Sequence, residues 1–90
     1  MESRRDRVDR LKNKFRPLGK ITRLKEFVRY DRAKKGQLEH PFPPEYVDDV
    51  WQALWELLRD DFGDARDFNK YLDAARKAPS EPFIKPDKKS

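Results

Sequence analysis

The sequence predicts an all-α protein: a small bundle of three to four helices, with a proline-rich connector and an extended C-terminal tail. Apolar residues recur at helical spacing in four segments, while no segment alternates apolar and polar residues as a strand does. Glycine or proline stands where these segments end. Because the chain has 90 residues and 43% of them are charged, we expect a single domain with a thin core over residues 1–78, followed by a tail over residues 79–90.

The first helix, from about Ser3 to Arg16, is expected to be a basic N-terminal helix or arm within residues 1–18. Ser3 suits the N-cap position, and Asp6 then lies in the first turn, where a carboxylate favours the free N–H groups. Lysine and arginine surround the apolar stripe on nearly every side, so packing alone would hold this helix weakly. The stripe is narrow and consists of Val8, Leu11 and Phe15.

A second basic helix is predicted within residues 19–36, and it ends at Gly36. Its buried face would consist of Ile21, Leu24, Phe27 and Val28. The connector over residues 37–44 is expected to be stiff and extended, with Phe42 packed on the domain. Its stiffness comes from three prolines: Pro41, Pro43 and Pro44.

Residues 44–78 are predicted to form an acidic two-helix hairpin that supplies most of the core. The short connection between the two helices is expected to be a tight helical corner or a hairpin turn. Pro44 suits the first turn of the first of these helices, whose wide apolar stripe is made of Val47, Val50, Trp51, Leu54, Leu57 and Leu58. Gly63 ends this helix, and Asp64 caps the next one. The apolar face of that last helix comprises Ala65, Phe68, Tyr71, Leu72 and Ala75. We expect the second helix of the chain to pack across this hairpin.

Charge is divided along the chain by position. Residues 1–39 hold 14 Lys and Arg against 6 Asp and Glu, a net charge of +8, whereas residues 40–75 hold 3 against 9, a net charge of −6. Residues 76–90 return to +3. A chain of this kind can meet a polyanion with its cationic part while the anionic part folds or meets another partner.

Enzymatic and metal-binding chemistry is not predicted, and no cofactor is expected. The chain has no cysteine and a single histidine, His40, so thiolate ligands and paired imidazole ligands are excluded. Asp60, Asp61, Asp64 and Asp67 gather around one helix junction, but they lack the spacing of a calcium loop and are interpreted as solvated surface charge. The three glycines are isolated, which excludes a glycine-rich phosphate loop.

We expect a non-enzymatic binding or regulatory protein whose basic N-terminal half contacts nucleic acid, DNA or RNA, or a nucleic-acid-containing complex. Arginine outnumbers lysine in this half, and guanidinium groups suit bidentate phosphate contacts. No sequence specificity is predicted, because a helix-turn-helix built from the last two helices would turn acidic side chains toward phosphate. The candidate nucleic-acid-binding residues are Arg5, Arg7, Arg10, Lys12, Lys14, Arg16, Arg23, Lys25, Arg29 and Arg32.

The alternative is a protein–protein interaction module: a small subunit, adaptor or inhibitor whose basic face grips an acidic partner. Trp55, at the edge of the third helix's apolar stripe, and Phe83, in the tail, are the candidate anchors. A second copy of the chain is another candidate partner, since oppositely charged halves of two copies can pair. The tail around Phe83 could dock on a partner or on its own domain.

No membrane association is expected. No stretch approaches the ~20 apolar residues that span a bilayer, and the charged N-terminus is unlike a signal peptide. The apolar stripe of the first helix is too small for stable insertion into a membrane surface. The sequence therefore predicts a soluble, intracellular protein of the cytoplasm.

Overall fold

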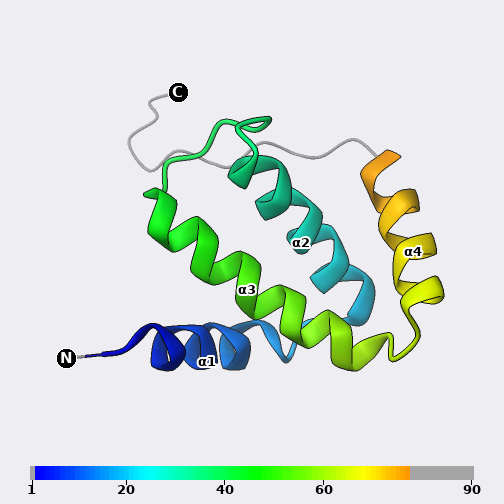
Figure 1. Ribbon diagram of the computed structural model, residues 1–90, viewed down its shortest axis with the longest axis horizontal. Coiled ribbons are helices and arrows are strands. Elements are labelled where there is room, and N and C mark those ends of the chain that lie inside the picture. Colours follow the sequence, from blue (N-terminus) through cyan, green and yellow to red (C-terminus); the bar gives the residue numbers. More distant parts are fainter. Residues whose placement is uncertain (1, 78–90) are drawn as a thin grey trace.

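The computed structural model describes residues 2–77, and this part of the chain consists of four helices and their connections (Figure 1). The helices are α1 (Arg4–Phe15), α2 (Lys20–Lys34), α3 (Pro44–Asp61) and α4 (Ala65–Lys77). No strand occurs within the described range. The all-α prediction is therefore confirmed, whereas the predicted tail over residues 79–90 lies outside the described residues.

The helices begin where capping groups are placed. The Ser3 hydroxyl accepts a 3.2 Å hydrogen bond from the backbone N–H of Asp6, and so acts as the N-cap of α1. Asp64 accepts a 2.8 Å hydrogen bond from the backbone N–H of Arg66 at the start of α4. Pro44 occupies the first turn of α3, where its missing N–H costs nothing. These local signals in the sequence correctly predict where the helices start.

Gly36 ends α2 in a left-handed conformation with a φ of 76°. The N–H of Gln37 donates a 2.8 Å hydrogen bond to the carbonyl of Arg32, and the N–H of Gly36 donates to the carbonyl of Ala33 at 3.1 Å. This pair of bonds is a Schellman motif, which satisfies carbonyl groups that the helix end would leave unpaired. Because a side chain at this φ would be strained, the motif favours glycine here.

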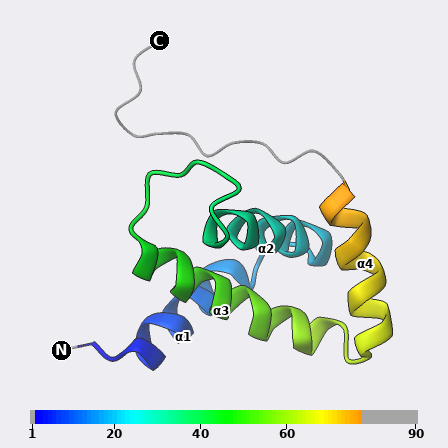
Figure 2. The ribbon, with the colours of Figure 1, turned by 45° about the horizontal axis from the view of Figure 1, so that its top comes forward.

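The central element of the core is α3, which packs against both α1 and α2 and runs antiparallel to α2 (Figures 1 and 2). The apolar stripe of α3 is almost entirely buried and includes Val47, Val50, Ala53, Leu54, Leu57 and Leu58. From α2, the buried apolar side chains are Leu24, Phe27, Val28, Tyr30 and Ala33. Ile21 is an exception to the predicted face, since 51% of it stays exposed in the first turn of α2.

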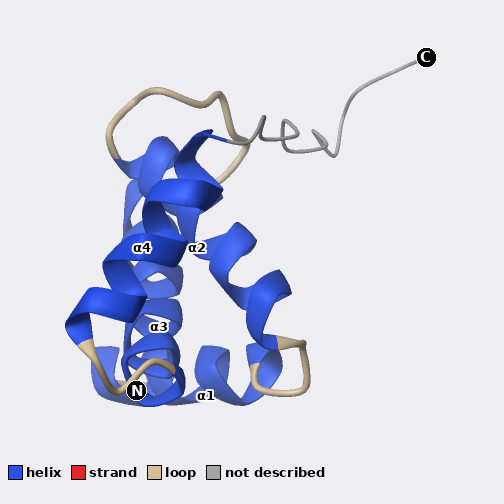
Figure 3. Cartoon of the chain, turned by 90° about the vertical axis from the view of Figure 1, so that its right-hand side faces the viewer, coloured by secondary structure: helices blue, strands red, loops and turns tan. Residues whose placement is uncertain are grey.

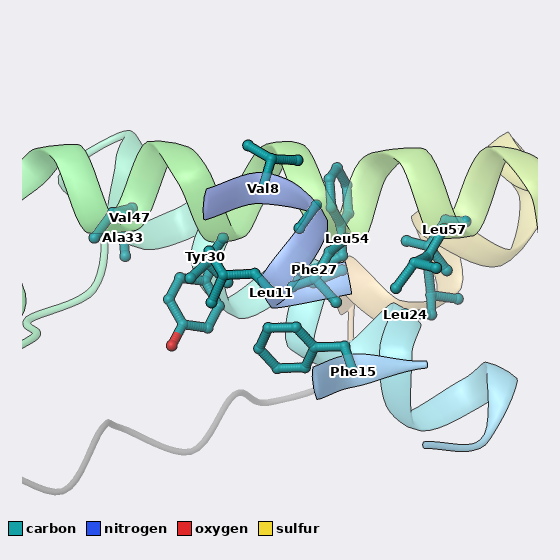
Figure 4. Packing of buried hydrophobic residues seen from close by; sticks show 14 of the residues in the cluster. Val8, Leu11, Phe15, Leu24, Phe27, Tyr30, Ala33, Val47, Leu54 and Leu57 are labelled. Atoms are coloured by element: carbon teal, nitrogen blue, oxygen red, sulfur yellow. The ribbon is translucent and has the colours of Figure 1, made fainter. Parts of the chain in front are cut away.

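The first helix is part of the core and not a projecting arm. Val8, Leu11 and Phe15 are all buried, and they point toward the side chains of α2 and α3 (Figure 4). The narrow stripe suffices because α1 crosses α3 and needs to bury only the side chains at the crossing. Of the two alternatives predicted for residues 1–18, helix or arm, the structure has the packed helix.

Of the two arrangements predicted for residues 44–78, a hairpin or a tight corner, the structure has the corner, because α4 turns away from α3 and packs against α2 (Figure 3). Phe62 at the end of α3 contacts Phe68 of α4 at a centroid distance of 6.0 Å. Phe68 also contacts Phe27 of α2 at 6.2 Å, edge to face. This second contact holds α4 toward α2. The only fully buried side chain of α4 is Leu72, so α4 contributes little to the core that the hairpin was expected to form.

The connector between α2 and α3 is packed on the domain through Phe42. Its ring lies 6.2 Å from the Tyr30 ring and 4.9 Å from the Tyr46 ring, centroid to centroid. Pro43 is the N-cap residue of α3, with an extended backbone. This aromatic contact is the packing that the position of Phe42 predicts.

Candidate functional site

Asp49 of α3 faces α1 and forms ion pairs with two arginines of that helix. The Nε of Arg4 lies 3.1 Å from one carboxylate oxygen, and the Nε of Arg7 lies 3.0 Å from the other. Only 8% of the Asp49 side chain is exposed. Burial by itself would raise the pKa of this carboxyl, but the hydrogen bonds from Arg7 and Arg4 outweigh it and keep the pKa below its usual value.

Glu56, two turns further along α3, holds a second pair of cations from α1. Arg5 donates to both of its carboxylate oxygens, at 2.9 and 3.1 Å, and Lys12 donates at 3.2 Å. Gln52 adds a 2.8 Å hydrogen bond from its side-chain amide. These donors, Arg5 above all, lower the pKa of Glu56 to about 2. Arg5, Arg7 and Lys12, which suggested phosphate binding, thus pair with carboxylates of the same chain.

Three more of the predicted nucleic-acid-binding residues pair with carboxylates. Arg23 contacts Asp61 at 2.6 Å and also donates to backbone carbonyls of the α1–α2 connection, those of Arg16 and Leu18. The other two pairs are Arg29 with Glu26 at 2.9 Å and Arg10 with Glu2 at 3.0 Å. Arg32 donates instead to the backbone carbonyl of Arg76, which connects α2 to α4.

Lys14, Arg16 and Lys25 are the members of the predicted set whose side chains form no ion pair or hydrogen bond within residues 2–77. The structure therefore does not bring the ten cations together as one free surface. From the sequence, the basic N-terminal half is expected to be a surface for a polyanion. In the structure, much of its charge forms the ion pairs that join α1 to α3. Four of the ten cations pair with carboxylates in the acidic half of the same chain, namely Arg5, Arg7, Lys12 and Arg23.

A groove with a volume of about 400 Å³ opens where α3 and α4 diverge, with α2 at its floor. It exists because α4 turns toward α2 and leaves the last turns of α3 uncovered. Its lining is mainly apolar and aromatic, and includes Phe27, Trp51, Trp55, Phe68, Asn69 and Leu72. At this volume the groove admits a few side chains, near the lower end of the roughly 300–1,000 Å³ range of ligand pockets.

Trp51 and Trp55 lie one turn apart on the α3 wall of this groove, and both are half-buried. The Trp51 ring packs 5.4 Å from the Phe27 ring, centroid to centroid. The guanidinium of Arg59 lies over the Trp55 ring, 4.7 Å from its centroid. Arg59 has no carboxylate partner in the part of the chain that the structure describes, so its charge is available at the rim of the groove.

Asp31 of α2 lies at the floor of the groove, with its side chain nearly buried. The indole N–H of Trp51 donates to one carboxylate oxygen at 3.1 Å, and the Lys35 ammonium donates to the other at 3.0 Å. The guanidinium of Arg76, from α4, lies 3.6 Å from that second oxygen. Burial would raise the pKa of Asp31, but the hydrogen bonds from Lys35 and Trp51 outweigh it and lower the pKa.

Sequence reasoning identified one residue of this groove, Trp55, as a candidate anchor. Phe83, the other predicted anchor, lies outside the described residues. Asp31, Arg59 and the α4 residues of the groove were not predicted, although the buried spacing of Asp31 with Phe27 and Val28 on one helix face was available as a signal. The groove itself depends on how α4 packs, which no local pattern specifies.

Within residues 2–77 there is no group of three His, Cys, Asp or Glu side chains placed to hold a metal ion. None of the helices in this range combines the length and the apolar character that crossing a membrane requires. The chain matches no protein-family model, and no curated protein or solved structure matches it.

Proposed function

We propose that this protein is a non-enzymatic protein-binding module, in which the groove between α2, α3 and α4 receives an apolar segment of a partner protein. The observation that carries this proposal is the pair of half-buried tryptophans, Trp51 and Trp55, on one wall of an apolar groove. Tryptophan is enriched among the residues that contribute most to the binding energy of protein interfaces, so a tryptophan that folding leaves partly exposed is a suitable anchor.

The charge at the rim favours a partner segment that also carries a carboxylate. Arg59 lies against Trp55 without a carboxylate partner among the described residues. A carboxylate of the partner would form a charge-assisted hydrogen bond there, next to the aromatic anchor. An acidic partner agrees with the protein–protein interaction module predicted from sequence as the alternative. The cation proposed to contact that partner is Arg59, however, and not the basic N-terminal half.

The proposed binding site does not include the cations of α1 that form ion pairs with α3. Arg5, Arg7 and Lys12 stabilise the contact between α1 and α3, so they are unsuited to grip a partner without loss of that contact. The lack of cysteine means that the fold depends on no disulfide, which is compatible with a function in a reducing compartment such as the cytoplasm.

The test uses a library of random 12-residue peptides displayed against the full chain. We expect the selected peptides to share an apolar or aromatic pair and a nearby Asp or Glu. On binding, the ¹H–¹⁵N signals of Asn69, Leu72 and the Trp55 indole should shift. Signals that shift along α1 in place of the groove would contradict the proposal.

Asn69→Trp and Asn13→Trp form a matched pair of variants. Both asparagines are exposed, but Asn69 lines the groove and Asn13 lies on α1. Asn69→Trp should fill the groove and reduce peptide affinity at least tenfold, whereas Asn13→Trp should leave it unchanged. Equal affinity of both variants for the selected peptides would overturn the groove as the binding site. Shifts of the groove signals with protein concentration alone would identify a second copy as the occupant and overturn a separate partner.

Nucleic-acid contact by the basic half is the second candidate, and it is favoured by Lys14, Arg16 and Lys25, which have no ion pair within residues 2–77. Because each phosphate contact contributes about −0.7 to −0.9 to the slope of log affinity against log salt, three contacts limit that slope to roughly −3. Fluorescence anisotropy with labelled duplex DNA, single-stranded DNA and RNA measures it. A combined Lys14→Ala, Arg16→Ala and Lys25→Ala variant should lose the binding, and unchanged affinity would contradict this candidate.

A further inference from the structure

We propose, building on the groove function above, that residues 81–84 of the same chain occupy the groove when no partner is bound. This segment, Glu81-Pro82-Phe83-Ile84, would act as an internal competitor that any partner must displace. Residues 78–90 lie outside the described residues, so their sequence and their point of attachment are what support this inference.

The point of attachment of the tail, the end of α4, lies beside the groove. Helix α4 forms one wall and ends at Lys77. At about 3.3 Å per extended residue, Phe83 lies within about 20 Å of Lys77 along the chain. The 13 residues of α4 span about 20 Å at 1.5 Å per residue. Phe83 can therefore reach any level of the groove if the chain turns back after α4, and Pro79-Ser80 is a sequence suited to such a turn.

The tail carries the chemistry that the groove is expected to recognise. Phe83 and Ile84 are its one pair of large apolar residues, and they suit the apolar lining near Trp55 and Leu72. Glu81 precedes that pair by two residues and supplies a carboxylate. The guanidinium of Arg76, at the end of α4 where the tail begins, lies 3.6 Å from Asp31 and retains donors for a second carboxylate.

Weak contacts suffice for an attached segment. A short linker gives an effective concentration in the millimolar range, so a segment with only millimolar affinity in isolation would occupy the groove for about half of the time. Prolines at positions 79, 82 and 86 lower the conformational entropy that docking must overcome. The measured affinity for a partner would then be the affinity of the open groove multiplied by the fraction of molecules whose groove is open.

The experiment compares two double variants of the full chain by ¹H–¹⁵N NMR without any peptide. Wild type should show cross-relaxation between the Phe83 ring and the Leu72 methyl groups, and Phe83→Ala with Ile84→Ala should shift the signals of Asn69, Leu72 and the Trp55 indole. Lys88→Ala with Lys89→Ala, in the same tail but without apolar side chains, should leave these signals unchanged. Groove signals that are identical in wild type and in the Phe83 and Ile84 variant would overturn the inference, as would signals that vary with protein concentration.

Affinity for a peptide from the displayed library gives the second readout. Removal of Phe83 and Ile84 should raise this affinity about twofold or more, since the groove is then always open. An unchanged affinity would overturn the competition. Failure of this inference is distinguishable from failure of the proposed function, because tail contacts are measured without peptide and groove binding is measured with Asn69→Trp.

Discussion

The indole N–H of Trp51 donates a 3.1 Å hydrogen bond to Asp31, and so joins α3 to α2 at the floor of the groove. The same carboxylate faces the guanidinium of Arg76 from α4. Three helices therefore meet at one ionised group, whose burial is offset by hydrogen bonds and opposite charge. Leu72 is the one buried residue of α4, so this polar contact adds to the contact of Phe68 with Phe27 in holding α4 against α2.

Replacement of Asp31 by Asn should loosen α4 more than any other helix. The amide oxygen still accepts from Trp51, but Arg76 loses its charged partner, and we expect the free energy of unfolding to fall by about 1–2 kcal/mol. Hydrogen exchange of α4 amides should become faster. Lys35→Ala is the control, because Lys35 contacts the same carboxylate from within α2 and should leave exchange in α4 unchanged. Equal α4 exchange in Asp31→Asn and wild type would refute this assignment.

Asp48 and Asp49 are neighbours in α3 with different surroundings, and their Asn variants should differ in stability. Asp49 is nearly buried and pairs with Arg4 and Arg7, whereas Asp48 is half exposed and lies 3.8 Å from Lys34. Asp49→Asn should lower the free energy of unfolding by about 1–3 kcal/mol, and Asp48→Asn by less than about 0.5 kcal/mol. Urea denaturation measures both. Similar losses would mean that the α1 ion pairs add nothing to the contact.

Acid should destabilise the protein partly through Glu56. The pKa of this carboxyl falls from the ordinary 4.5 to about 2 in the folded protein, so below about pH 5 the unfolded chain binds more protons than the folded chain. The free energy of unfolding should therefore be constant above about pH 5.5 and decrease as pH falls toward 2. Glu56→Gln should reduce this acid dependence, leaving the part that belongs to Asp31 and Asp49. An identical pH profile for the variant would contradict the prediction.

Truncation of Leu11 should show that α1 belongs to the core. Leu11 is 9% exposed whereas Ile21 in the first turn of α2 is 51% exposed. Leu11→Ala should cost about 2–4 kcal/mol of unfolding free energy, because it removes buried methyl groups and leaves a cavity. Ile21→Ala should cost less than about 1 kcal/mol, since its side chain stays in contact with water. Thermal unfolding followed by circular dichroism compares the two, and similar costs would be inconsistent with a packed α1.

The helices were predictable from sequence because their determinants are local. Ser3, Gly36 and Pro44 each act within one turn of their own position, through a cap, a left-handed residue or a missing N–H. Periodicity also identified most buried positions. It failed at Ile21, because the apolar spacing of a helix continues into its first turn whether or not another element covers that turn.

The groove and the ion pairs were not predictable, because they depend on how distant segments pack. Arg7 and Asp49 are 42 residues apart, and the sequence gives no sign that α1 crosses α3 at that point. The orientation of α4 depends on Phe68 meeting Phe27 of α2 in addition to Phe62 of α3. The aromatic residue at position 68 predicted a buried side chain, but the sequence did not indicate whether α2 or α3 would contact it.

The long separation of the α1–α3 ion pairs has a consequence for synthesis on the ribosome. Arg5 emerges 51 residues before Glu56, its carboxylate partner, which at 5–20 residues per second is a delay of roughly 3–10 s. During that interval the nascent chain presents an arginine-rich segment without its partners on α3, beside ribosomal RNA whose phosphates attract it. Synthesis of α3 then supplies these partners, so the order of translation determines when a polycationic segment becomes an internal structural contact.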